Sequence, residues 1–346
     1  MDFSLSGEAR DLTGMTRDLA ASGRPLWPAL AEAGVLAAAL PKRAGGEGYG
    51  LLEQCAILAE LGRHAAAVPY LPSIVAAASA LARFGGDDQV AEWAQPACRG
   101  EIVLTAAAPG GTVRAESVAA GWRLDGTVSA VPAADAAALV LVPAGPGVFL
   151  VRPDDPGVTV EAQQVAGGPG AGLLRLAGVT LPAGRLIADP AAGPWLTAHT
   201  TVGACAAQLG VVERALEMTA EYARTRVQFG RPIGAFQAVA QRLADAHIDV
   251  EGLRLATWQA AWLLAEHPPA TAEVATAGFW AAEAGHRVLH AAVHVHGGVG
   301  LDVEYPLHRY FLAAKYHEFL LGGATAQLLA LGEVFNSEVE RVTVLA

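Results

Sequence analysis

The chain has 346 residues, of which 53% are hydrophobic and only 16% are charged. Acidic residues outnumber basic ones by 34 to 23, and the resulting net charge of −11 argues against a nucleic-acid partner, because phosphate binding requires a basic surface. The low charged fraction excludes a disordered chain. Since Asp, Pro and Gly interrupt the long apolar stretches, no membrane-spanning helix and no membrane partner are predicted.

The cysteines and the alanine content indicate where the protein resides and how it assembles. Cys55, Cys98 and Cys205 are widely spaced and form neither a metal-binding pattern nor a disulfide framework. Together with the lack of a signal-peptide pattern at the start, they predict a cytoplasmic protein. Much of the hydrophobic content is alanine, which exceeds the needs of one core and predicts an obligate oligomer.

Three regions follow one another along the chain. Residues 1–101 have apolar residues at helical spacing, which predicts an N-terminal helical domain. Residues 102–195 contain short β-branched runs between Gly and Pro turns, which predict a central β domain. Residues 196–346 predict a four-helix bundle. Its four long amphipathic stretches are 202–225, 235–266, 271–296 and 305–345.

This order of elements excludes two large enzyme classes. Strands and helices do not alternate, so neither a Rossmann sheet nor a TIM barrel is expected. No GxGxxG segment lies between a predicted strand and a predicted helix, and the sequence therefore lacks a nicotinamide-binding fingerprint.

The segment RTRVQFGRPIG, residues 224–234, separates the first two long helices of the bundle. Its arginines and Phe229 suit a ligand that carries both a pyrophosphate and a flat ring, since guanidinium binds phosphate oxygens in a bidentate manner. The alternative is an ordinary helix end at which arginines complement the helix dipole. Composition alone favours the second interpretation and leaves the first open.

The segment HVHGGVG, residues 294–300, ends the third long helix. Its glycines allow a ligand to approach the backbone closely. His294 and His296 lie two residues apart, so on a helix their side chains diverge by about 200°. Since no further ligand cluster lies near them in the sequence, no metal site is predicted.

These two segments, in this order and at this spacing, resemble the acyl-CoA dehydrogenase family of FAD-dependent flavoproteins. The stretch 26–72, with its glycine-rich loop, and GWRLDGTVSAVP at 121–132 extend the resemblance over nearly the whole chain. The resemblance implies an α+β multidomain fold: an N-terminal helical domain, a central β-barrel domain and a C-terminal four-helix bundle.

The resemblance also implies an FAD that is shared across a subunit interface, with its ADP end held by the neighbouring subunit's bundle. His294 stands where the family usually has Gln, and a histidine can still donate a hydrogen bond. The residues that correspond to the ADP end are Arg226, Gln228, Phe229, Gln237, His294, Gly297 and Gly298.

The family's catalytic glutamate has no counterpart at the expected positions. The usual position falls on Leu321, and the position used by some members falls on Thr200. Neither side chain takes up a substrate α-proton near neutral pH. Glu318, one helical turn before Leu321, is a weak candidate for a relocated base, although a glutamate paired with Lys315 is the more ordinary interpretation. His308 and His317 fall under the same caution.

The segments that face the flavin in the family are also altered. Residues 104–111 read LTAAAPGG and lack the acidic residue and the serine that the family usually has there. Residues 129–132 read SAVP, where an aromatic residue normally packs on the flavin. The chain's own flavin site is therefore predicted to be degenerate.

The intact ADP-end residues and the missing base together predict the non-catalytic β-type subunit of a heteromeric, α2β2 acyl-CoA dehydrogenase. A homologous subunit would supply the glutamate, an acyl-CoA with a bulky steroid side chain would be the substrate, and an electron-transfer acceptor would reoxidise the FAD. The chain alone is expected to be inactive. Two alternatives stay open: a homo-oligomeric enzyme with a relocated base such as Glu318, and a flavin-free scaffold that binds acyl-CoA.

Overall fold

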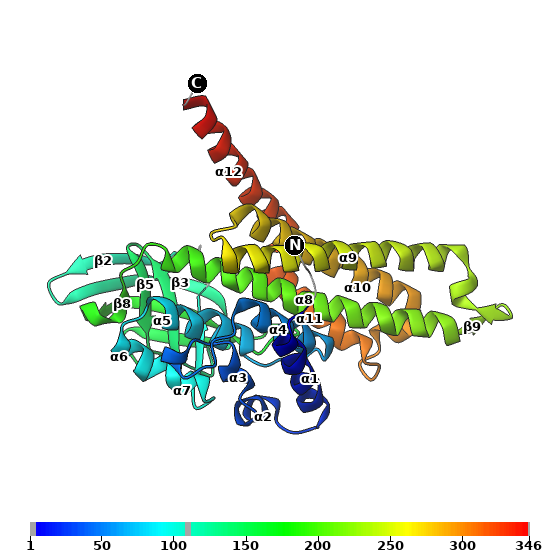
Figure 1. Cartoon of the computed structure of the whole chain (residues 1–346), viewed down its shortest axis with the longest axis horizontal. Helices are drawn as coiled ribbons and strands as arrows, with labels where there is room; N and C mark the ends of the chain where they lie inside the picture. The colour runs from blue at the N-terminus through cyan, green and yellow to red at the C-terminus, as the bar shows by residue number, and fades with distance from the viewer. Residues whose placement is uncertain (1–4, 108–111, 345–346) are drawn as a thin grey trace. The chain divides into compact units, whose positions relative to one another are not determined.

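The computed structural model describes residues 5–107 and 112–344. Helices come first, strands follow, and long helices complete the chain (Figure 1), so the α+β architecture predicted from the sequence is confirmed. The first helices are α1 (Gly7–Ala21), α2 (Leu26–Glu32), α3 (Val35–Ala38), η1 (Lys42–Ala44), α4 (Leu51–Arg63), η2 (Tyr70–Ala78), α5 (Ser79–Phe84), α6 (Asp87–Gln89), η3 (Val90–Ala94) and α7 (Gln95–Cys98).

The β-rich middle of the chain comprises eight strands and one short helix among the described residues. They are β1 (Val103–Ala106), β2 (Arg114–Val118), β3 (Gly121–Pro132), β4 (Ala137–Ala144), β5 (Gly147–Val151), β6 (Val158–Gln163), β7 (Ala171–Leu181), η4 (Ala183–Arg185) and β8 (Leu186–Ile187).

The C-terminal part consists of long helices and one small hairpin. Its elements are α8 (Ala192–Thr225), β9 (Val227–Gln228), β10 (Arg231–Pro232), η5 (Ile233–Ala235), α9 (Gln237–Glu266), α10 (Thr271–His296), η6 (Gly297–Leu301), α11 (Leu307–Leu320) and α12 (Gly323–Val344).

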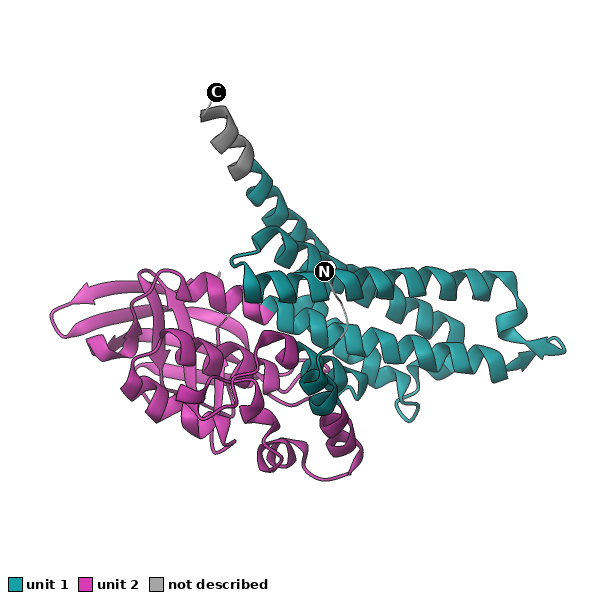
Figure 2. Cartoon of the chain, in the orientation of Figure 1, with its two compact units in different colours: residues 1–13, 55–66, 201–346 teal, residues 14–54, 67–200 magenta. Residues whose placement is uncertain are grey.

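Packing divides the chain into two compact units (Figure 2). Unit 1 contains residues 1–13, 55–66 and 201–346, and unit 2 contains residues 14–54 and 67–200. The boundaries between the units lie within α1, α4 and α8, so each of these helices contributes residues to both units. The three-domain boundaries expected from the sequence stay a prediction.

Unit 2 contains two four-stranded sheets around a shared core. One sheet has the order β1-β4-β5-β8 and the other β2-β3-β7-β6. The β1–β4 pair is parallel, and the remaining pairs in both sheets are antiparallel. Buried side chains from both sheets meet in this core, among them Val140 and Phe149 from one and Leu124, Leu174 and Val179 from the other. In β7 the buried residues partly alternate with exposed ones, whereas β4 and β5 are buried over most of their length.

Unit 1 is a helical bundle in which two glycines allow α4 and α8 to cross closely. A Cβ atom at Gly210 would lie 1.8 Å from the carbonyl oxygen of Ala59, and one at Gly62 would lie 2.0 Å from that of Ala207. Because both neighbours are backbone atoms, only glycine fits at either position without movement of a helix.

A buried glutamine connects three helices of the same bundle. The side-chain amide of Gln208 in α8 donates to the carbonyl oxygens of Ala281 in α10 (3.1 Å) and Ala314 in α11 (3.2 Å). Gly285 makes room for it, since a Cβ atom there would lie 1.7 Å from the glutamine nitrogen. This contact fixes how α8, α10 and α11 face one another.

The fourth long helix of the sequence-based prediction, 305–345, is wrong as a single element. It is divided into α11 and α12, because Gly322 and Gly323 have φ angles of +75° and +76°, which a helix does not accommodate. By length and composition alone, the stretch Leu307–Asn336 is the one candidate membrane helix among the described residues, and its most apolar window is 6% buried. Its apolar surface is therefore largely exposed.

Candidate functional site

The hairpin between α8 and α9 presents an aromatic side chain at its tip. Gln228 pairs with Arg231 and Val227 with Pro232, so that Phe229 and Gly230 form a two-residue turn. Their φ angles of +51° and +79° correspond to a type I′ turn. The Phe229 side chain is 92% exposed. A left-handed conformation costs a non-glycine residue about 1–2 kcal/mol, and at this exposed position burial of the ring does not offset that cost.

Arg226 stands at the base of this hairpin with its backbone fixed and its side chain exposed. Its N–H donates to the Tyr222 carbonyl and its carbonyl accepts from the Ile233 N–H, both at 2.8 Å. Within the described part of the chain, no hydrogen bond or ion pair holds the Arg226 guanidinium. Among these described residues, no contact to the last carbonyls of α8 occupies the Arg226 guanidinium, so it is available to an anion, and the helix-dipole alternative stays open.

Aromatic contacts connect the hairpin to the start of α9, where Gln237 is the first residue. The rings of Phe229 and Phe236 meet edge to face with centroids 6.2 Å apart, and the Arg231 guanidinium lies 4.2 Å from the Phe236 ring. The structure thus brings Arg226, Gln228, Phe229 and Gln237 onto one exposed surface, which projects beyond the ends of α8 and α9 in Figure 1.

The glycine-rich segment after α10 has open space where a ligand can approach. The backbone at position 297 has a φ of +65°, a left-handed conformation that favours glycine. A Cβ atom at Gly298 would meet nothing within 4 Å, so internal packing does not require a glycine there. His294 is exposed and His296 is 4% exposed, which places the two rings on different sides of the helix. Across the described residues, no group of three or more side chains suits a metal ion.

The sequence missed a cluster that joins the hairpin end of α8 to the glycine-rich segment. The His296 ring stacks on Tyr222 with centroids 4.3 Å apart, and its Nε2 lies 3.2 Å from the Tyr305 hydroxyl. The sequence did contain a signal for this cluster, because Tyr222 comes one helical turn before Arg226 and His296 directly precedes Gly297. The two predicted halves of the ADP-end site therefore lie at the same end of the bundle.

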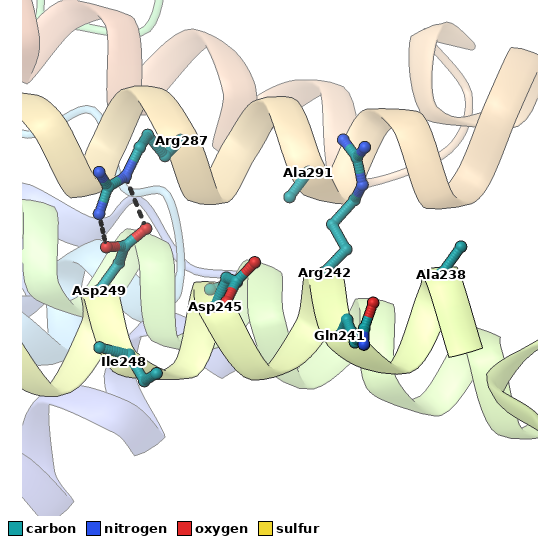
Figure 3. Close-up of a pocket in the computed structure, with 9 residues that line it drawn as sticks. Ala238, Gln241, Arg242, Asp245, Ile248, Asp249, Arg287 and Ala291 are labelled. Carbon is teal, nitrogen blue, oxygen red and sulfur yellow. Dashed lines mark hydrogen bonds and ion pairs between the residues drawn. The ribbon is translucent and has the colours of Figure 1, made fainter. Parts of the chain in front are cut away.

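A groove of about 670 Å³ runs between α9 and α10 (Figure 3). Asp249, 3% exposed, is held by a bidentate ion pair with Arg287, with the Nε–Oδ2 contact at 2.9 Å. Arg242 lines the same groove, and no hydrogen bond or ion pair with another described residue holds its guanidinium. The groove starts at Ala238, beside Gln237, so it continues from the hairpin surface along the bundle.

The two positions of the family's base hold side chains without basic atoms. Leu321 is 6% exposed, its N–H donates to the His317 carbonyl (3.0 Å), and its own carbonyl accepts from the Gln327 amide (2.6 Å). The Thr200 hydroxyl donates to the Leu196 carbonyl at 2.8 Å. Leu321 has no proton acceptor in its side chain, and a neutral threonine hydroxyl is too weak a base near neutral pH.

The weak candidate Glu318 is held in an ion pair. Its carboxylate lies 2.7 Å from Lys315 Nζ and 3.4 Å from His286 Nδ1, and its side chain is 17% exposed. These contacts correspond to the ordinary interpretation of Glu318 as a paired glutamate, and its use as a base stays a prediction. Nearby, burial lowers the pKa of His317 to about 4, and His308 Nδ1 lies 2.7 Å from the Tyr305 carbonyl.

The β segments that correspond to the family's flavin-facing residues are occupied by internal contacts. The buried Thr105 hydroxyl donates to the Pro132 carbonyl. Ala130 has a φ of +53° and donates its N–H to the Gln163 side chain (2.7 Å), within an irregular stretch of the β3–β7 pairing. Residues 108–111 of the predicted segment lie outside the described residues.

The hairpin and the glycine-rich segment fit a dinucleotide in their chemistry. Guanidinium and amide donors suit a pyrophosphate, Phe229 offers an exposed ring face, and the space at Gly298 admits a ligand close to the backbone. These residues fit the ADP end of FAD. The described parts of the segments that face the flavin in the family instead make hydrogen bonds within the chain.

Comparisons with known proteins agree over most of the chain. Residues 10–101 match the family described as "Acyl-CoA dehydrogenase, N-terminal domain", and residues 195–335 match its C-terminal domain. Acyl-CoA dehydrogenase FadE27 of Mycobacterium tuberculosis is 48% identical, over 96% of this chain and 98% of its own length.

Two solved structures are similar throughout. A chain of the ChsE4-ChsE5 complex from Mycobacterium tuberculosis is 48% identical, with a TM-score of 0.93 over 97% of this chain and 99% of that one. A chain from a variant of the Tcur3481-Tcur3483 steroid ACAD is 38% identical, with a TM-score of 0.89 over 96% of this chain and 99% of that one.

Proposed function

The chain belongs to the acyl-CoA dehydrogenase family of oxidoreductases, and we propose that it is the non-catalytic β-type subunit of a heteromeric member. It contributes the ADP-end surface for an FAD whose reactive ring lies in a homologous catalytic subunit. One observation carries the proposal: Phe229 of the predicted ADP-end residues is 92% exposed, whereas Leu321, to which the resemblance assigns the position of the base, is 6% exposed.

The hairpin supports a cofactor that is shared between subunits. Phe229 is 92% exposed and Arg226 is without a described partner, so both are available to a ligand held jointly with another chain. Arg226 would neutralise the pyrophosphate charge, and Phe229 would pack on the adenosine end. When bound, FAD supplies hydride acceptance in α,β-dehydrogenation, and this chain's residues supply binding and orientation.

The lack of a basic side chain at the two expected positions supports the proposal that a different subunit removes the substrate proton. α-Proton removal requires an acceptor within hydrogen-bond reach of the substrate. Leu321 has no such atom, the Thr200 hydroxyl is too weak a base, and the Glu318 carboxylate is already paired with Lys315. A partner that carries the glutamate would complete the reaction, and this chain alone would be inactive.

A homologous partner is supported by both the relatives and the surface of the bundle. The two similar structures carry the names of protein pairs, ChsE4-ChsE5 and Tcur3481-Tcur3483, and the second is called a steroid ACAD. In this chain Phe319, Leu328, Leu329 and Phe335 of α11 and α12 are 50–75% exposed. Apolar surface of this kind on one helical stretch marks a protein interface.

The substrate class follows from the same relatives. We propose an acyl-CoA with a bulky steroid side chain, whose polycyclic group would use the room that the missing base leaves in half of the subunits. An electron-transfer acceptor would reoxidise the flavin.

Co-expression with a homologous glutamate-bearing subunit tests the proposal. We expect a complex with half as many flavins as subunits, and Arg226→Ala should release the flavin although the catalytic subunit is unchanged. The control is Arg214→Ala, since Arg214 also lies on α8 but pairs with Glu217 at 3.1 Å. Stoichiometric FAD and turnover in the chain alone would favour the homo-oligomeric enzyme, and a complex without flavin under every co-expression would favour the scaffold.

A further inference from the structure

We propose that His296 is a positioning residue that holds the two halves of the dinucleotide surface in one arrangement. It contacts the end of α8, which leads into the Arg226 hairpin, and it directly precedes Gly297. This role rests on the proposed function, because it concerns the same surface, but it assigns a residue that does not itself face the ligand.

The His296 side chain is buried between two tyrosines from different segments. It is 4% exposed, and its ring lies nearly parallel to Tyr222, with an interplanar angle of 21° and centroids 4.3 Å apart. The Tyr305 ring lies 5.3 Å away on the segment before α11. Three segments that are distant in the sequence therefore meet at one ring.

Both ring nitrogens of His296 have partners, and this determines the tautomer. Nδ1 lies 2.9 Å from the Ala292 carbonyl, which can only accept, so Nδ1 carries the proton. Nε2 is then the acceptor for the Tyr305 hydroxyl at 3.2 Å. Burial lowers the pKa of His296, which keeps this neutral form at physiological pH. The ring is thus fixed in orientation by two hydrogen bonds and one stack.

The consequence for the ligand surface follows from backbone contacts. The Tyr222 carbonyl accepts from the Arg226 N–H at 2.8 Å, so movement of Tyr222 moves the base of the hairpin. On the other side, η6 packs tightly on the end of α10, since a Cβ atom at Gly300 would lie 3.1 Å from His296 Cβ. His296 therefore couples the position of Arg226 to that of Gly297 and Gly298.

The experiment compares three substitutions in the complex with the catalytic subunit. His296→Phe keeps a ring for the stack and removes both hydrogen bonds. His296→Asn restores a donor toward the Ala292 carbonyl, and Tyr305→Phe removes only the hydroxyl. We expect about tenfold faster FAD release for His296→Phe, with partial rescue by His296→Asn. Amide hydrogen exchange at Arg226 and Gly297 in the isolated chain should accelerate in parallel.

His199→Phe is the matched control. His199 is also buried, stacks on an aromatic ring (Trp195, 3.5 Å) and faces the carbonyl of the residue four positions earlier, at 3.0 Å. It belongs to unit 2, whereas all the ADP-end residues belong to unit 1. We expect His199→Phe to lower thermal stability and leave both FAD release and exchange at Arg226 unchanged.

The outcomes separate this inference from the proposed function. Unchanged FAD release in a folded His296→Phe complex, or equal acceleration in His199→Phe, overturns the positioning role and leaves the shared cofactor intact. If the wild-type complex holds no FAD, the proposed function fails, and exchange at Arg226 and Gly297 still decides whether His296 couples them. If His296→Phe does not fold, Tyr305→Phe tests the Nε2 hydrogen bond alone, and unchanged FAD release and exchange in that variant overturn the positioning role.

Discussion

Among the hairpin residues, a substitution of Phe229 best distinguishes an effect on ligand binding from an effect on the stability of the chain. Because its side chain is 92% exposed, Phe229→Ala removes almost no buried area from the isolated chain. The free energy of unfolding should therefore change by less than about 0.5 kcal/mol. Phe229→Gly should stabilise the isolated chain by about 1 kcal/mol, because glycine adopts the φ of +51° without strain.

The same substitution should have a large effect once a dinucleotide covers the ring. Complete burial of a phenylalanine side chain is worth about 1.5–3 kcal/mol, which corresponds to about tenfold to hundredfold weaker FAD binding for Phe229→Ala. The assay is titration of FAD into the flavin-depleted complex, followed by flavin fluorescence. Urea unfolding of the isolated chain supplies the stability arm.

Phe319→Ala is the control, since Phe319 is 75% exposed but lies on α11, outside the ADP-end residues. Phe319→Ala should leave the FAD affinity unchanged in the fraction of the protein that forms the complex with the catalytic subunit. Two results would refute the reasoning: undiminished FAD affinity in Phe229→Ala, or a loss of stability in the isolated chain equal to the loss of affinity. The first removes Phe229 from the ligand surface, and the second makes it a structural residue.

Three further predictions test the site and the packing. Gly298→Ala should leave unfolding unchanged, because a Cβ atom there meets nothing within 4 Å, yet should weaken FAD binding in the complex. Gly210→Ala should destabilise the chain by about 3 kcal/mol in urea unfolding, since its Cβ would lie 1.8 Å from the Ala59 oxygen. Burial lowers the pKa of His199 to about 4 from 6.5, so the unfolded chain binds the extra proton first as pH falls. Stability should decrease from pH 6.5 toward pH 4 by at most about 1.4 kcal/mol per unit from this group, and His199→Phe should reduce that slope.

The sequence predicted the elements that have a strong period and few glycines. The helical stretches 271–296 and 235–266 agree with α10 and α9 within two residues. The stretch 305–345 was wrong as a single helix, because an apolar pattern continues through Gly322 and Gly323 while their backbone does not remain helical. β7 lies within the β domain predicted at residues 102–195, and Gly172 and Gly178 interrupt its alternating pattern.

The candidate site was predictable in its residue types and not in its contacts. From the sequence, residues 224–234 could be interpreted either as a helix end or as a ligand surface. The sequence could not show that Phe229 is exposed or that the Arg226 guanidinium lacks a described partner. The His296 cluster depends on contacts across more than 70 residues, from Tyr222 to His296. No local pattern encodes such a contact, because it arises only when the helices pack.

The net charge of −11 and the alanine-rich composition acquire a common explanation in the proposed assembly. Three arginines at the end of α8 and in the hairpin, Arg224, Arg226 and Arg231, are exposed on a chain of net negative charge, and solubility alone does not require basic residues to cluster there. The apolar side chains exposed on α11 and α12 would likewise cost free energy in water if no partner covered them. An exposed arginine-bearing hairpin, an exposed apolar helical stretch and a buried Leu321 are all consistent with the proposed role as one part of a larger enzyme. The proposed heteromer predicts that both surfaces become protected from solvent in the same assembly step, which hydrogen exchange before and after addition of the catalytic subunit measures.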